Sequence, residues 1–143
     1  MPKTLVYFVS DLHGSSMCFR KFVNSTKVYK PKVLILGGDV AGKAIQSIVK
    51  APGGRYQCEF VGTRYDISDE NELKDLERLI ADHGYYPYRA EPGELEAMEA
   101  GGTLDDLFFR LMRDRLAEWL DIADTRLRPQ GIPLYMMLGN DDP

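Results

Sequence analysis

Three short apolar runs in the chain each end abruptly in polar residues. The runs are residues 5–9, 33–36 and 134–138. The polar residues that follow them are Asp11, His13, Asp39 and Asn140. Aliphatic and aromatic runs of this length predict strands, and the second run, apolar throughout, predicts a strand buried on both faces of a parallel sheet. Since ligands bind beyond the carboxyl ends of such strands, we expect these polar residues to converge on one site.

A helix is expected between the first two strands. Ser15 can cap it, its apolar residues recur at helical spacing, and Pro31 stops it after Tyr29. The resulting order of strand, helix and strand predicts a right-handed parallel crossover and an α/β fold. This geometry places Asp11, His13 and Asp39 at the same edge of the sheet.

Three further helices are expected, the first from Ser68 or Asp69 to near Gly84, the second after Pro92 and the third from Thr103 to about Arg126. In the last of these, Thr103 followed by Asp106 resembles a capping box. Its apolar stripe, expected to pack on the sheet, comprises Leu104, Phe108, Leu111, Leu116, Trp119 and Ala123.

The middle of the chain, residues 41–102, carries weaker patterns. Residues 44–50 and 56–61 can form a hairpin, although the first arm could equally be a short helix. The segments 51–66 and 84–102 lack periodicity. We therefore expect residues 1–143 to form a single domain in which 41–102 is an insertion or a lid over the site. Lys43, Arg55 or Arg64 would be available there to meet an anionic group of a substrate.

Composition narrows the function classes. The chain has 143 residues, of which 44% are hydrophobic and 28% are charged, as in an ordinary globular domain. The formal net charge of −4 does not favour nucleic acid as a partner. No apolar stretch approaches the roughly 20 residues that span a bilayer, so we expect no membrane partner and a cytoplasmic location.

The strand endings resemble a known family. Asp11-x-His13, Gly38-Asp39 and Gly139-Asn140-Asp141-Asp142 follow strands in this order. They look like the first three signature blocks of the calcineurin-like metallophosphoesterases, over residues 4–40 and 131–142. The resemblance implies a β-sandwich flanked by helices. It also implies an enzyme that hydrolyses phosphate monoesters or diesters at a two-metal centre.

The resemblance assigns metal ligands residue by residue. Asp11 and His13 would bind the first metal, Asp39 would bridge both metals, and Asn140 would bind the second. Two divalent cations neutralise the phosphoryl oxygens and lower the pKa of a bridging water, which then attacks the ester. Oxygen and imidazole ligands suit Mn, Fe, Zn, Co or Ni and do not select among them.

The chain departs from the family pattern in two ways. The third block usually reads Gly-Asn-His, with a histidine that meets the substrate, whereas Asp141 stands at this candidate catalytic position. At pH 7 an aspartate is ionised and would repel phosphate unless a metal or a pKa shift intervenes. The later blocks, with three further histidines, have no counterpart. The chain therefore resembles the N-terminal portion of the fold, and a C-terminal remainder or a partner subunit would complete the site.

Other interpretations stay open. A catalytically inactive half-domain or interaction module would retain the same blocks, and the strand-end residues could be ordinary turn residues. The segment 37–43 has the glycine and lysine spacing of a nucleotide-binding P-loop, but Ala44 offers no hydroxyl for Mg²⁺. His83 stands near the end of a predicted helix, where an imidazole complements the helix dipole.

Overall fold

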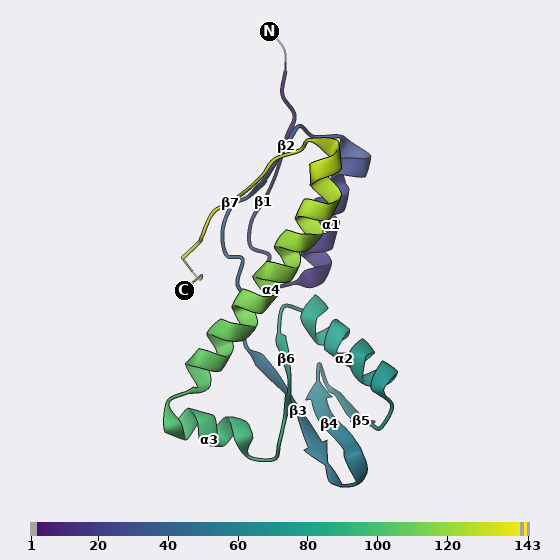
Figure 1. The fold of residues 1–143 in the computed structure, drawn as a ribbon, viewed down its shortest axis with the longest axis vertical. Coiled ribbons are helices and arrows are strands. Elements are labelled where there is room, and N and C mark those ends of the chain that lie inside the picture. Colours follow the sequence, from purple (N-terminus) through teal and green to yellow (C-terminus); the bar gives the residue numbers. More distant parts are fainter. Residues whose placement is uncertain (1–2, 141, 143) are drawn as a thin grey trace.

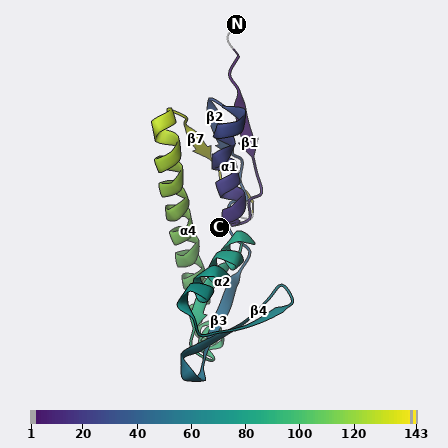
Figure 2. The same ribbon diagram turned by 90° about the vertical axis from the view of Figure 1, so that its right-hand side faces the viewer.

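The computed structural model describes residues 3–140 and residue 142. These residues form an elongated α/β molecule with two sheets, one in each half of the ribbon in Figure 1. The longest helix, α4 (Leu104–Leu127), runs along both halves, as Figures 1 and 2 show. None of the helices in the described part of the chain is both long and apolar enough to cross a membrane.

The first sheet contains the three strands that end in the polar residues. Its order is β1-β2-β7, and both pairings are parallel. The strands are β1 (Val6–Val9), β2 (Val33–Leu36) and β7 (Leu134–Met136). This confirms the three predicted strands and places their carboxyl ends at one edge of the sheet.

Only one face of this sheet is covered. Leu34 and Leu36 are fully buried and pack in a core with α1 (Ser16–Tyr29) and α4. On the opposite face Phe8 and Tyr135 are 58% and 59% exposed. The prediction that β2 is buried on both faces was therefore wrong, because no element of the described chain packs against the second face.

The second sheet comes entirely from the middle of the chain and has the order β5-β4-β3-β6. The strands are β3 (Ile45–Ala51), β4 (Arg55–Phe60), β5 (Thr63–Ile67) and β6 (Tyr86–Ala90). The hairpin of β3 and β4, joined by a short turn at Pro52–Gly54, confirms the strand interpretation of residues 44–50. Helix α2 (Glu70–Asp82) covers one face and encloses a separate apolar core.

Two strands of this sheet were missed in the sequence. β5 lies within a segment that shows no clear periodicity, and β6 reads as a turn because it contains Pro87. Proline lacks the amide hydrogen that a central strand must donate, but β6 is the edge strand, where this is tolerated. Pairing with β3 therefore overrides the local preference.

The helices follow their predicted boundaries closely. The Ser15 hydroxyl accepts the Cys18 amide at the start of α1, and the Asp69 carboxylate accepts the Asn71 and Glu72 amides at the start of α2. Helix α3 (Glu94–Gly101) follows Pro92 as expected. Thr103 precedes α4 but makes no side-chain cap, because its hydroxyl donates to the Met98 carbonyl oxygen instead.

The apolar stripe of α4 is only half as predicted. Trp119 and Ala123 are buried against the first sheet and α1, but the first half of the helix buries Leu107, Met112 and Arg115. The helix also contacts α3 and β6, and in its first half Phe108 packs edge-on against Tyr86 of β6. The buried face changes because the helix changes its packing partner along its length. The helix ends in a short turn, Arg128–Gln130, before β7.

The second sheet lies beyond the carboxyl ends of β1 and β2 (Figure 1), the ends that Asp11 and Asp39 follow in the chain. The predicted insertion therefore occupies the edge of the first sheet at which a lid would have to sit. Arg55, however, lies at the far turn of the hairpin and pairs with Asp66 at 2.7 Å. Arg64 lies on β5, and Lys43 precedes β3, next to the strand ends.

Candidate metal centre

The loops after β1 and β2 run side by side and continue the parallel pairing of the strands. The Asp11 amide donates to the Gly38 carbonyl oxygen at 3.0 Å, and the His13 amide donates to the Asp39 carbonyl oxygen at 3.0 Å. The Gly14 amide donates to the next carbonyl oxygen, at 2.8 Å. The backbone thus places Asp11, His13 and Asp39 on adjacent turns, as the sequence predicted.

All three of these residues adopt left-handed backbone conformations. The φ angles are 61° at Asp11, 44° at His13 and 50° at Asp39. A positive φ in a residue other than glycine costs on the order of 1–3 kcal/mol and persists only where the surrounding structure imposes it. Aspartate and histidine tolerate this region better than most residues. Strain at three residues that follow two neighbouring strands is typical of a functional site.

The side chains of Asp11 and His13 point toward each other. His13 Nε2 lies 3.8 Å from Asp11 Oδ1, and the two side chains are 39% and 59% exposed. The Ser10 hydroxyl donates to the other carboxylate oxygen of Asp11. Two donor atoms that bind the same metal ion, each at about 2.0–2.2 Å, lie about 3–3.5 Å from one another. A small rotation of either side chain would therefore allow both residues to share a cation.

The loop after β7 approaches Asp39 at backbone distance. A Cβ atom on Gly139 would lie 2.1 Å from Asp39 Oδ1, and one on Gly38 would lie 2.9 Å from the Gly139 Cα. Both positions therefore require glycine. Asn140, which is exposed, is the next residue in the chain. The structure thus places the backbone that leads into Asn140, the predicted ligand of the second metal, against Asp39, the predicted bridging residue.

Asp142 joins the second and third loops, a role that the sequence analysis did not assign. Its Oδ1 accepts the Val40 and Ala41 amides at 2.8 and 2.6 Å, and its Oδ2 accepts the Gly139 amide at 2.8 Å. Burial alone would raise the pKa of this carboxyl group, but the hydrogen bonds from backbone amides outweigh burial and lower it. An ionised Asp142 therefore fixes the loop that carries Asn140.

The four predicted ligands lie at one edge, but their side chains do not form one compact group. Among the described residues, no three His, Cys, Asp or Glu side chains meet in a ready-made metal-binding arrangement. Asp11 faces His13, whereas Asp39 faces Gly139. Carboxylate, imidazole and amide groups suit a divalent cation. For these four side chains to bind the same pair of cations, some of them would have to change rotamer. Asp141, the predicted catalytic residue, lies outside the described residues.

Comparisons with known proteins add no family. No protein-family model, curated protein or solved structure matches this chain.

The loop that resembles a P-loop has a different surrounding. Lys43 is followed by strand β3, whereas a P-loop leads into a helix that holds the phosphates at its N-terminus. The amides of Val40 and Ala41 converge on the carboxylate of Asp142. The position of an anion within this loop is thus taken by the chain's own side chain, and nothing in the geometry favours a nucleotide.

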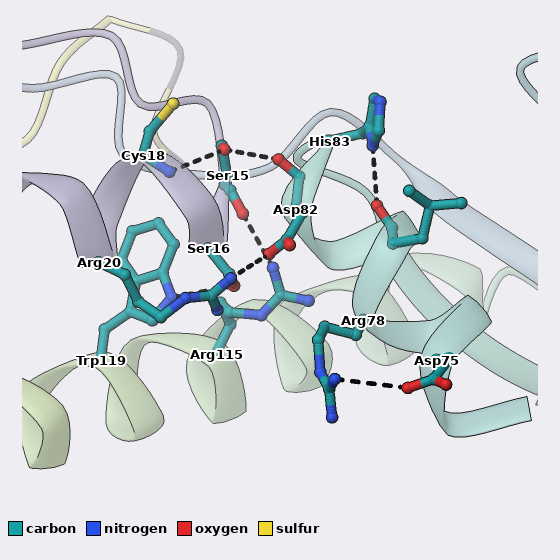
Figure 3. Close-up of polar contacts among 12 residues, drawn as sticks. Ser15, Ser16, Cys18, Arg20, Asp75, Arg78, Asp82, His83, Arg115 and Trp119 are labelled. Carbon is teal, nitrogen blue, oxygen red and sulfur yellow. Dashed lines mark hydrogen bonds and ion pairs between the residues drawn. The ribbon is translucent and has the colours of Figure 1, made fainter. Parts of the chain in front are cut away.

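His83 is not part of the strand-end pair. Its Nδ1 lies 2.8 Å from the carbonyl oxygen of Leu79, one turn back in α2, as Figure 3 shows. Its ring packs edge-on against Phe60. This supports the interpretation of His83 as a residue that completes the end of α2.

Proposed function

We propose that the chain belongs to an enzyme that hydrolyses a phosphate ester at a metal centre beyond β1, β2 and β7. The observation that carries this proposal is the left-handed backbone at Asp11, His13 and Asp39. Val61, in an exposed hairpin turn, is also left-handed, but these three residues carry side chains that can bind a metal and they lie together beyond neighbouring strands, where the conformation gives each side chain a defined direction. We further propose that the fold is the N-terminal portion of a metallophosphoesterase-like β-sandwich flanked by helices.

Each residue of the site has a defined role in this proposal. Asp11 and His13 hold the first divalent cation, Asp39 contributes its carboxylate to both cations, and Asn140 contributes its amide oxygen to the second. Such a pair of cations supplies a nucleophilic water and neutralises the phosphoryl oxygens. Asp142 keeps the Asn140 loop in place. By the resemblance, Asp141 would stand in the sequence where the family has the histidine that meets the substrate.

The ligand sets of the two cations are unequal. The first would have an aspartate, a histidine and the shared Asp39, the three protein ligands that are usual for a catalytic metal with open positions. The second would have only Asp39 and the neutral oxygen of Asn140. We therefore propose that a partner subunit or further residues of the same protein supply the remaining ligands of the second cation. The open apolar face of β1, β2 and β7 is consistent with such a partner.

An interaction module without activity is the alternative that a specific observation favours. The exposed side chains Phe8 and Tyr135 on that open face would serve binding whether or not metals are present. The two proposals differ in what they require of Asp39. The metal centre requires the shared carboxylate, whereas binding through the open face does not, so a substitution of Asp39 tests the metal centre separately.

The test is a calorimetric titration with Mn²⁺ on the wild-type chain and on Asp39→Asn. We expect about one tight equivalent for the wild type and an affinity lowered at least tenfold in the variant, because the charge that both cations share is lost. Asp105→Asn, which removes an exposed aspartate at the start of α4, is the matched control and should bind as the wild type does. Zn²⁺ should compete for the same equivalent.

A second arm tests the phosphoryl ligand. Inorganic phosphate should bind the wild-type chain in the presence of Mn²⁺ and not in its absence. Hydrolysis of an aryl phosphate should stay near the buffer rate, because the second cation lacks most of its ligands. Unchanged Mn²⁺ binding by Asp39→Asn would contradict the ligand assignment. Two tight equivalents with rapid hydrolysis would show that the chain holds ligands other than those assigned.

A further inference from the structure

Arg115 is a buried arginine at the point where the two halves of the molecule meet. Arg115 lies in the middle of α4 and is only 8% exposed. Its Nη1 donates to the Gly14 carbonyl oxygen at 2.8 Å, and its Nη2 donates to the Tyr85 carbonyl oxygen at 3.3 Å. The guanidinium also lies 5.2 Å from the centre of the Tyr86 ring. An apolar residue would fill this space without the cost of burying a charge, so the charge needs an explanation.

The segments that Arg115 touches pack at backbone distance. A Cβ atom on Gly14 would lie 2.3 Å from the Gly42 Cα, and one on Gly84 would lie 2.2 Å from the His13 carbonyl oxygen. The Gly42 amide donates to the Tyr86 hydroxyl at 2.7 Å. The loops after β1 and β2 and the start of β6 therefore meet directly behind the candidate ligand His13.

We infer that Arg115 is a positioning residue that holds the His13–Gly14 turn in its left-handed conformation and couples it to the second sheet. Gly14 is the residue directly after His13, so a hydrogen bond to its carbonyl oxygen restricts the backbone that aims the imidazole. The bond to Tyr85 anchors the same guanidinium to the segment that leads into β6. Displacement of the second sheet is thus transmitted to a candidate metal ligand. The part that concerns metal affinity rests on the proposed function.

A second arginine nearby provides a matched control. Arg20 on α1 pairs with Asp82 at the end of α2, with 2.6 Å between Nη2 and Oδ1 (Figure 3). Ser15 reinforces this junction by donating its hydroxyl to the Asp82 carbonyl oxygen at 2.6 Å. Arg20 thus also joins the two halves through a guanidinium. This ion pair is with a side chain of α2, not with the turn that carries His13.

The experiment compares Arg115→Met, Arg115→Lys and Arg20→Met. Methionine keeps much of the apolar bulk and removes the donors, while lysine keeps the charge and the ability to donate one bond. Mn²⁺ affinity is measured by calorimetry, the free energy of unfolding by urea titration, and the amide signals of His13 and Gly14 by NMR without metal. We expect Arg115→Met to lower Mn²⁺ affinity by about tenfold, as second-layer substitutions around metals do. Arg115→Lys should lie between this variant and the wild type.

Arg20→Met should destabilise the fold but change Mn²⁺ affinity less than about twofold and leave the His13 and Gly14 signals in place. Those two signals should shift in Arg115→Met even without metal. If they stay unchanged in both Arg115 variants, the positioning role is wrong. If the signals shift but wild-type chain binds no Mn²⁺, the proposed function fails while the positioning role stands. Should Arg115→Met not fold, Arg115→Lys decides both questions.

Discussion

At the scale of single residues, the site depends on backbone conformations that the local sequence does not favour. Asp11, His13 and Asp39 are left-handed because amides in the loop after β1 donate to carbonyl oxygens in the loop after β2. The positions of these residues after strands predicted that they lie at the same edge of the first sheet. The left-handed backbone could not be predicted, since it arises from hydrogen bonds between segments that lie far apart in sequence.

Asp142 gives a prediction about pH. Its folded pKa is lowered by backbone amides that outweigh the effect of burial. A lowered folded pKa means that its stabilisation is fully present above the unfolded value of about 3.9 and is lost as the pH falls through the folded value. We expect Asp142→Asn to be less stable than the wild type at pH 7, and the difference to shrink below about pH 4.

Urea unfolding at pH 7, 4 and 3 measures this difference. Asp105→Asn is the control, because it removes an exposed carboxylate at the start of α4. If Asp142→Asn lowers the unfolding free energy as much at pH 3 as at pH 7, the carboxylate does not hold the loops through its charge.

At the scale of elements, turn residues decide how well the fold can be predicted. The caps Ser15 and Asp69 mark the starts of α1 and α2, and both helices begin one residue later as expected. Strand β6 was missed because its proline outweighs its aromatic residues in any local assessment. Edge position and pairing with β3, which a single sequence does not reveal, stabilise it.

The turn between β4 and β5 predicts a stabilising substitution. Val61 and Gly62 have φ angles of 49° and 73°, so both central residues of this tight turn are left-handed. A β-branched residue is strained there, whereas Asn-Gly is the preferred pair for such a hairpin. Val61 is 72% exposed, so little packing would be lost. We expect Val61→Asn to raise the free energy of unfolding by about 1 kcal/mol.

Thermal or urea unfolding checks this, with Val61→Thr as the control. Threonine is polar but retains the β-branch, so it should not stabilise the protein. Equal gains in the two variants would attribute the effect to removal of an exposed apolar side chain rather than to relief of backbone strain.

The glycine contact behind the site gives a second prediction for this scale. Gly84 has a φ of 86°, and a Cβ atom there would lie 2.2 Å from the His13 carbonyl oxygen. Gly53 has a φ of 77° with nothing within 4 Å of its Cβ position. Gly53→Ala should therefore lower the unfolding free energy by about 1–2 kcal/mol, the cost of a left-handed backbone in alanine. Gly84→Ala should lower it by about 2–5 kcal/mol, because the added methyl group also clashes with the His13 carbonyl oxygen.

The difference in unfolding free energy between these two alanine variants measures the effect of the close approach between Gly84, which precedes β6, and the backbone of His13. Equal losses in urea unfolding would mean that the two segments do not need to touch in solution.

At the scale of the whole molecule, the open face of the first sheet is the feature that most needs an explanation. The residues of β1, β2 and β7, all of which the structure describes, include no charged residue. Parallel sheets are normally covered on both faces. The strands themselves were predictable from their apolar runs, but alternation between a covered and an open face was not, because both faces are equally apolar.

The open face predicts that the chain binds an apolar dye while folded. Tyr135→Lys should lower the fluorescence of bound anilinonaphthalene sulfonate at pH 7 without lowering helix content, because it places a charge on that face. Val28→Lys, at an exposed apolar residue of α1, is the control and should leave the fluorescence unchanged. Equal fluorescence in wild type and Tyr135→Lys would indicate that the dye binds elsewhere.

The position of bound Mn²⁺ tests the central proposal most directly. Paramagnetic broadening of backbone amide signals in the folded chain reports which residues lie near the cation. We expect sub-stoichiometric Mn²⁺ to broaden the amide signals of Asp11, His13, Asp39 and Asn140 first, and to leave those of α2 sharp. Broadening centred on the acidic residues of α2, such as Glu70 and Glu72, with sharp signals at the strand ends, would contradict a metal centre beyond β1, β2 and β7.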